Sequence, residues 1–172
     1  MNTINNKRKK QSQEKIEKSF LELIQIKELN QISVTDICKI SNLNRTTFYA
    51  NYVDIYDLAD KIRIKLEEDV LNLYKDERDN QYNNNDFLKL FRHIKENQLF
   101  YKTYFKLGFD KSCLFNSYDY NLADKYYKHN NIDYHITFFK AGLNAIILKW
   151  LNNNCIESPE TIFQIIKDEY NK

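Results

Sequence analysis

The chain has 172 residues, 42% of them hydrophobic, a size that suits one domain or a small head with a larger body. Two glycines and one proline are too few for a sheet protein with many turns, so the composition favours helices. The net charge of only +2 excludes a histone-like polycation, and the absence of any run of about 18 apolar residues excludes a membrane span.

The first residues and the cysteines bear on the cellular compartment. The opening segment, MNTINNKRKKQ, has no apolar signal core, so export is not expected. Cys38, Cys113 and Cys155 are odd in number and far apart, which fits a reducing compartment better than a disulfide framework. We therefore expect a cytoplasmic protein whose cysteines are small buried side chains.

A first helix is predicted over about residues 8–28. Its apolar stripe consists of Ile16, Phe20, Leu23 and Ile24. The basic run just before it consists of Lys7, Arg8, Lys9 and Lys10. Taken alone, such a run is usually a solvated terminus. Beside a helix-turn-helix it becomes a candidate arm for phosphate or the minor groove, and we then expect it to be disordered without DNA.

A short second helix is predicted to follow Ser33. Ser33 is a good N-cap, and Asp36 three residues later completes a capping-box pattern. Ile37 and Ile40 are expected to face inward. The turn that follows contains Asn42, a residue that tolerates the left-handed conformation that ends many helices.

A third helix is predicted from Arg45 to about Tyr52, capped by Asn44, with Phe48 and Tyr52 inward at i and i+4. Its other face carries Arg45, Thr46, Thr47, Tyr49 and Asn51. No acidic residue occurs between Lys39 and Val53. Two helices joined by a short turn, the second polar and free of acid on its outer face, are typical of a helix-turn-helix that binds DNA.

These residues resemble the DNA-binding domain of the tetracycline-repressor-like (TetR/AcrR) transcriptional regulators over about residues 10–60. The matching motif runs from Ser33 through Ile37 to the turn of residues 41–43 and then to the segment NRTTFYANY. Three positions depart from the family pattern: Asn42 replaces a turn glycine, Thr46 replaces Gly or Ala, and Ile55 replaces a lysine that contacts phosphate.

The resemblance implies two sets of DNA contacts. Contacts to base edges are expected from Thr35, Arg45, Thr46 and Tyr49. Contacts to phosphate are expected from Ser33, Asn44, Thr47, Asn51, Lys7, Arg8, Lys9 and Lys10. Arg45 is the first candidate for a base, since guanine is the commonest partner of arginine.

The rest of the chain predicts further helices. A long helix capped by Asp54 extends to about Asp76, and its face consists of Leu58, Ile62, Leu66, Val70 and Leu73. A loop is expected over 76–86. The next helix is predicted to start at Asp86, and its inner residues are Phe87, Leu90, Phe91 and Ile94. A further helix over Gln98–Leu107 is expected to end at Gly108. The last three are predicted over Ser112–Lys128, from Asp133 to Leu151, and from Ser158 onward.

The helix that begins near Asp133 is apolar on more than one face and carries three small residues close together. It could be a central core helix or part of a dimer interface. The last two helices resemble those that pair two subunits as a four-helix bundle in the TetR/AcrR family. The interface is expected at Ala141, Gly142, Leu143, Ile147, Trp150, Ile162 and Ile166, or near neighbours.

Aromatic residues crowd the segment 100–127. Most suit ordinary packing, but the family resemblance implies an inducer pocket in the body, for which the candidates are Tyr101, Tyr104, Phe105 and Tyr118. The three histidines lack zinc-site spacing, and neither a glycine-rich phosphate loop nor a Gly-x-Ser-x-Gly motif occurs. We therefore expect no metal, no cofactor and no enzymatic activity.

Together these features predict an all-α protein of about nine helices, with a DNA-binding domain at 1–54 and a ligand-binding and dimerisation body at 55–172. The expected function is a ligand-responsive repressor that binds a palindromic double-stranded operator as a homodimer and is released by a small molecule. The alternative is a TetR-like adaptor or co-activator that acts through protein partners, favoured by Ile55 and by Arg45 being the one charged residue of the third helix.

Overall fold

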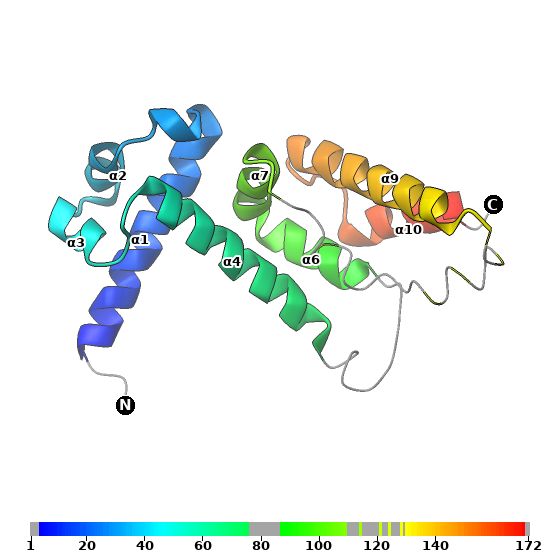
Figure 1. Ribbon diagram of the computed structural model, residues 1–172, viewed down its shortest axis with the longest axis horizontal. Helices are drawn as coiled ribbons and strands as arrows, with labels where there is room; N and C mark the ends of the chain where they lie inside the picture. Colours follow the sequence, from blue (N-terminus) through cyan, green and yellow to red (C-terminus); the bar gives the residue numbers. More distant parts are fainter. Residues whose placement is uncertain are drawn as a thin grey trace. The chain divides into compact units, whose positions relative to one another are not determined.

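The computed structural model describes residues 4–75, 87–109 and 130–170, with residues 114, 121, 124 and 128 between them. All regular secondary structure in these ranges is helical, so the all-α prediction is confirmed. The helices (Figure 1) are α1 (Ile4–Ile26), α2 (Val34–Ser41), α3 (Arg45–Tyr49), α4 (Ile55–Leu73), α6 (Leu88–Glu96), α7 (Gln98–Lys106), α9 (Ile132–Asn152) and α10 (Pro159–Tyr170). A short 3-10 helix spans Leu29–Gln31.

Some predictions fall outside these residues. They are the loop 76–86, the cap Asp86, Ser112, Cys113 and nearly all of the helix Ser112–Lys128. Of the other cysteines, Cys38 and Cys155 are free and buried, as expected. No helix in the described part of the chain is long and apolar enough to cross a membrane.

The chain divides into two compact units, residues 1–66 and 67–172. In the first, α1 packs on α2, and α2 packs on α3. Its fully buried side chains include Ile16, Phe20, Ile24, Ile37, Phe48 and Leu58. The first turns of α4 belong to this unit, and Lys65 Nζ lies 2.8 Å from Glu17 Oε2 of α1. The domain border expected at 54/55 therefore falls inside the first compact unit.

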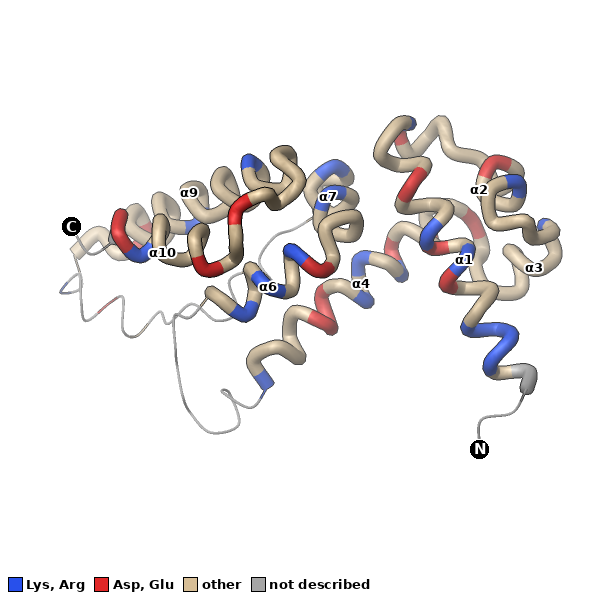
Figure 2. The backbone as a smooth tube through the Cα atoms, turned by 180° about the vertical axis from the view of Figure 1, so that it is seen from behind, with Lys and Arg blue, Asp and Glu red and all other residues tan. Residues whose placement is uncertain are grey.

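The basic run at the N-terminus is helical. Helix α1 begins at Ile4, before Lys7, so the prediction that the arm is disordered is wrong. The physical reason is local, because Lys, Arg and Gln are good helix formers. Ser12 Oγ also donates to the carbonyl of Arg8 at 3.0 Å. The four basic residues are exposed. They form the basic stretch of the backbone at the start of α1, blue in Figure 2.

In the second unit, α7 packs on α6 and α9, and α10 packs on α6. The predicted inner residues of α6 are all buried, and the ring of Phe91 meets that of Trp150 edge to face at 6.0 Å. Gly108 has φ +66° and ends α7 as expected. Ser158 Oγ accepts the N–H of Thr161 at 3.1 Å, so the predicted start of α10 is confirmed.

Three expectations about individual positions are wrong. Asp133 does not cap α9, since the cap is Asn131 in the left-handed region at φ 48° and Asp133 lies in the first turn. Ile40 is 48% exposed, because Cys38 and Ser41 share the inward side of α2 with Ile37. Just after α4, Tyr74 rather than Leu73 continues the buried row at i+4 from Val70.

Gly142 lies inside α9, where a Cβ added to it would meet no atom within 4 Å. Gly142→Ala should therefore raise the free energy of unfolding by about 0.5–1 kcal/mol, because alanine loses less backbone entropy in a helix. Urea unfolding followed by circular dichroism measures this change. A destabilised variant would instead place a second chain against Gly142.

Candidate nucleic-acid interface

The local structure of α2 is fixed at both ends. Ser33 Oγ accepts the N–H of Asp36 at 3.1 Å, and Asp36 Oδ2 accepts the N–H of Ser33 at 3.1 Å, so the predicted capping box is confirmed. The bond from the Ser33 backbone, helped by Lys27 at 3.2 Å, lowers the pKa of Asp36. Asn42 ends α2 in the left-handed conformation at φ 53°, also as predicted.

Helix α3 begins as predicted but ends early. Asn44 Oδ1 accepts the N–H of Thr47 at 2.7 Å and its hydroxyl at 2.8 Å, so Asn44 is the N-cap. The helix ends at Tyr49 rather than near Tyr52. Beyond it, Asn51 Nδ2 donates back to the carbonyl of Thr47 at 2.8 Å, a side-chain bond that competes with a regular helix. The Thr47 hydroxyl therefore belongs to the cap network, and Thr47→Ala removes a structural bond as well as a candidate phosphate contact.

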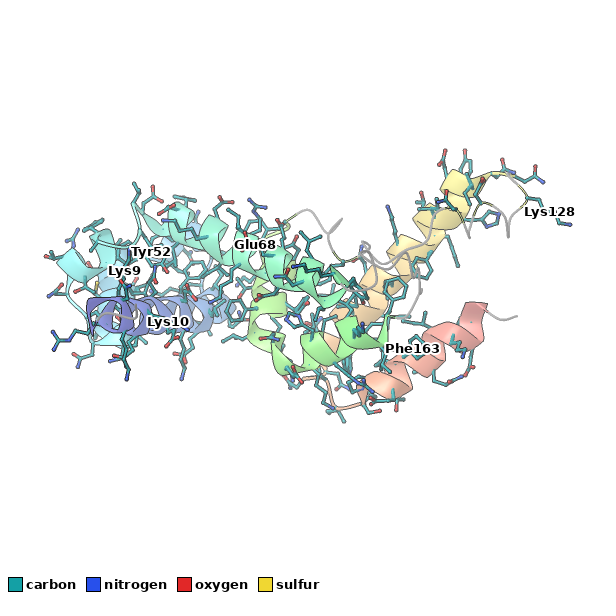
Figure 3. The ribbon with its side chains drawn as sticks, turned by 90° about the horizontal axis from the view of Figure 1, so that it is seen from below. Lys9, Lys10, Tyr52, Glu68, Lys128 and Phe163 are labelled. Atoms are coloured by element: carbon teal, nitrogen blue, oxygen red, sulfur yellow. The ribbon has the colours of Figure 1, made fainter. Side chains whose placement is uncertain are left out.

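The inner face of α3 anchors it to the rest of the unit. Phe48 is fully buried and Tyr52 is nearly so, both as predicted. Tyr52, labelled in Figure 3, donates from Oη to Glu17 Oε1 at 3.2 Å. Burial raises the pKa of the Tyr52 phenol.

Lys61 was not singled out from the sequence. Its Nζ lies 5.1 Å from the centroid of the Tyr52 ring and donates to the carbonyl of Asn51 at 3.1 Å.

The sequence does carry an indication of the role of Lys61. Asp57 lies at i−4, and Asp57 Oδ2 accepts from Lys61 Nζ at 2.9 Å and from the N–H of Val53 at 2.8 Å. The N–H of Val53 and the charge of Lys61 both lower the pKa of Asp57. Asp54 Oδ1 in turn accepts the N–H of Asp57 at 2.8 Å, so the predicted cap of α4 is confirmed. These bonds hold the end of α3 to the start of α4.

The outer face presents the four residues expected to reach bases. Thr35 on α2 and Arg45, Thr46 and Tyr49 on α3 are all exposed. Arg45 Nη2 donates to Tyr49 Oη at 3.3 Å, and this bond raises the pKa of the guanidinium. The packing of α2 on α3 brings the two helices together, so these exposed polar side chains lie on adjoining helices of one unit.

The residues expected to contact phosphate are arranged less uniformly. Ser33 and Asn44 are exposed at helix starts, and the basic run of α1 is exposed. Asn51 is turned inward, because its amide nitrogen bonds to Thr47 and its Oδ1 is buried without a partner within the described residues. Ile55, at the position of the family lysine, is 7% exposed and packs as a core residue.

The second unit uses its predicted interface residues differently. Exposed fractions of 0–7% show that its own chain covers Leu143, Ile147, Trp150, Ile162 and Ile166. These side chains form the core of the unit, so in this conformation they are not available to a second chain. Ala141 is exposed and Gly142 is partly exposed. Sequence reasoning missed a second apolar stripe, which we call the α9 outer stripe: Tyr134, Phe138, Ala141, Ala145 and Leu148.

Two of the predicted pocket residues are core tyrosines with polar partners. Tyr101 Oη lies 2.7 Å from His93 Nδ1, and Tyr104 Oη donates to Glu67 Oε1 at 2.9 Å. Burial lowers the pKa of His93. Of the other two pocket candidates, Phe105 is partly exposed and Tyr118 lies outside the described residues. Where the structure describes the chain, no group of three or more His, Cys, Asp or Glu could hold a metal ion.

Comparison with known proteins finds similar transcriptional regulators. Residues 81–171, more than half of the chain, match a TetR family model described as "Transcriptional regulator C-terminal region". Over 126 residues the chain is 32% identical to the HTH-type dhaKLM operon transcriptional activator DhaS of Lactococcus lactis subsp. lactis (strain IL1403). The match covers 72% of this chain and 66% of that protein, just under two thirds of its length.

Proposed function

The chain belongs to the TetR family of transcriptional regulators, and from this premise we propose that it binds a two-fold symmetric DNA operator as a homodimer through α2 and α3. The observation that carries the proposal is the polar surface of the first unit. Four exposed side chains with hydroxyl or guanidinium groups lie on two packed helices, and no acidic residue follows Lys39 until after Val53. On α2 the carboxylate of Asp36 is paired with Lys27, so such a surface can approach the DNA backbone with little charge repulsion.

We assign base contacts to Arg45 first, and then to Thr35 and Thr46. Arginine presents two N–H groups to guanine O6 and N7, and threonine can bond to several bases or contact the thymine methyl group. Phosphate contacts are assigned to Ser33, Asn44 and Thr47. Asn51 would have to leave its bond to Thr47 to join them. The buried Ile55 supplies no such contact, which leaves the basic start of α1 as the main source of positive charge.

Replacing Lys7, Arg8, Lys9 and Lys10 by Gln should weaken operator binding most at low salt. The slope of log affinity against log salt should become shallower by about 0.9 for each phosphate that the variant no longer neutralises. Fluorescence anisotropy at several salt concentrations measures the slope. A control with the same change of charge in the second unit replaces Lys75, Lys128, Lys149 and Lys167 by Gln. If both variants have the same slope of log affinity against log salt, the basic run is a solvated helix end that does not contact phosphate.

For dimerisation we propose the α9 outer stripe. Its residues follow one another at spacings of four, three, four and three, which places them on one side of a helix. Tyr134 is 79% exposed, Phe138 75% and Leu148 43%. The two alanines at the centre would allow close approach of a second helix. A two-fold axis there would pair the stripe with its own copy, as a symmetric operator requires.

The proposed regulation is displacement by a small molecule that binds the second unit. Its buried tyrosines, Tyr101 and Tyr104, carry hydroxyl groups whose present partners a polar ligand could replace. The proposed ligand binds best to a dimer whose two DNA-binding units are spaced wrongly for successive major grooves. Such a ligand would shift the population away from the DNA-bound state. Repression is the simplest outcome of a bound dimer that blocks a promoter. Because the partner is DNA, a cytoplasmic location is part of this proposal.

A second candidate is transcriptional activation, with or without direct DNA binding. The relative from Lactococcus lactis is named an activator. An adaptor that acts through protein partners could also tolerate Ile55 in place of a phosphate-binding lysine. Activation would need a protein contact in addition to the DNA surface, or in place of it.

Two measurements separate these candidates. An electrophoretic shift with the DNA upstream of the chain's own gene tests binding, and a stable complex resistant to excess unrelated DNA is expected. Transcript levels after deletion of the gene then give the sign, since targets of a repressor rise and targets of an activator fall. A protein that changes transcription without binding DNA in any shift experiment would be an adaptor.

A further inference from the structure

The exposed pair of Arg45 and Tyr49 forms one unit on the outer side of α3. The guanidinium carbon of Arg45 lies 5.8 Å from the centroid of the Tyr49 ring, and Arg45 Nη2 donates to Tyr49 Oη at 3.3 Å. The two residues are four positions apart, a spacing that places side chains next to each other on a helix. Tyr49 therefore contacts Arg45 both through its ring and through its hydroxyl.

Tyr49 is itself held by the core. Its ring meets the ring of Phe48 edge to face, at 5.5 Å between centroids and 88° between planes. Phe48 is fully buried, so one neighbour of Tyr49 is fixed, although Tyr49 is 50% exposed. A tyrosine has few rotatable bonds, whereas a free arginine has many conformations to lose when it binds. The ring thus forms a platform that limits where the guanidinium can point.

We propose that Tyr49 is a positioning residue that orders Arg45 for one base of the operator, rather than an independent contact to a base. The proposal rests on the proposed DNA-binding function and names a specificity device within it. Arginine has five N–H donors, and the bond to Tyr49 uses one of them at Nη2. Enough donors remain for the two N–H groups that guanine O6 and N7 accept.

The charge of Arg45 stays available in this arrangement. Its partner in the described part of the chain is a phenol and not a carboxylate, so no ion pair has to break before DNA binds. This differs from Arg63 of the same unit, whose Nη2 lies 2.7 Å from Asp60 Oδ1. Arg45 is thus both oriented and electrostatically free, which suits recognition of an electronegative base edge.

The test is a double-mutant cycle measured on an operator selected with the wild-type protein. Tyr49→Phe keeps the ring and removes the hydroxyl, and Tyr49→Leu removes both. We expect Tyr49→Phe to weaken binding roughly 2- to 10-fold, as for the removal of one hydrogen bond, and Tyr49→Leu to weaken it more. In the Arg45→Ala background both changes should have almost no effect. Discrimination against a substituted guanine should fall in parallel, a readout that a merely structural residue would not change.

Tyr56→Phe is the matched control, since Tyr56 is 60% exposed on the same unit and its hydroxyl is not part of the pair. Thermal melts of each variant check that the fold is kept. Equal losses for Tyr49→Phe in both backgrounds would overturn the inference and make Tyr49 a direct DNA contact. Unchanged affinity and discrimination would overturn it as well. If the wild-type protein binds no operator, the proposed function fails and the inference fails with it.

Discussion

Ala145→Glu is expected to convert the protein into a monomer of about its chain mass, 20.8 kDa, and to abolish tight operator binding. Ala145 is exposed near the centre of the α9 outer stripe, which carries no charged side chain. In a two-fold interface a glutamate there would be buried and would face or approach its own copy, and an unpaired buried charge is strongly unfavourable. A monomer offers one α3 to the DNA, so the apparent affinity should fall by roughly 100-fold or more.

Light scattering and operator titration of the same sample measure both effects. The matched control is His135→Glu, which adds negative charge to α9 at an exposed position that the helical repeat turns away from the stripe. It should leave the mass at twice that of the chain. If Ala145→Glu remains dimeric, the stripe is not the interface, and the buried residues predicted from the sequence would have to become exposed before dimerisation.

Arg45→Ala should weaken operator binding roughly 5- to 150-fold and relax the sequence preference at one position in each half-site. The effect should be specific, because Arg45 is exposed and supports no core packing. Titrations against the operator and against single-base variants measure the affinity and the preference together.

Arg63→Ala is the control for this prediction. It removes an arginine from the same unit, where the side chain is paired with Asp60. That variant should bind with almost unchanged affinity and preference. If the Arg45→Ala variant discriminates between bases no less than the wild type does, Arg45 does not contact a base.

Helix starts and inner faces were predictable because short-range rules decide them. The caps at Ser33, Asn44 and Ser158 each need one side-chain oxygen and a nearby backbone N–H, which three or four residues of sequence specify. The buried rows on α4 and α6 follow from the helical repeat in the same way.

Where the prediction missed, contacts distant in sequence or competing side-chain bonds decide the structure. The early end of α3 depends on Asn51 bonding to Thr47 and on Lys61 from α4 reaching the Asn51 carbonyl. The helical start of α1 follows from the high helix propensity of lysine and arginine. The prediction considered only the charge of the basic run and not this propensity.

Helix α9 illustrates a different limit of sequence patterns. Apolar residues on two faces of α9 indicate that both faces are buried in contacts. They do not indicate which face packs against the same chain. The second unit packs α9 on α7 and Trp150 against Phe91 of α6. It buries Leu143, Ile147 and Trp150 and leaves Phe138 and Ala145 of the stripe outside. The choice depends on the shape of the neighbouring helices, which no local pattern encodes.

Selection of bound sequences from a random pool of double-stranded DNA by the full chain is the sharpest test of DNA recognition by α2 and α3. We expect enrichment of an inverted repeat whose half-site centres lie about one helical turn, or a multiple of it, apart. We also expect each half-site to hold a guanine whose enrichment disappears when Arg45→Ala is used for the selection. Recovery of no sequence beyond a control without protein would show that the chain does not recognise an operator.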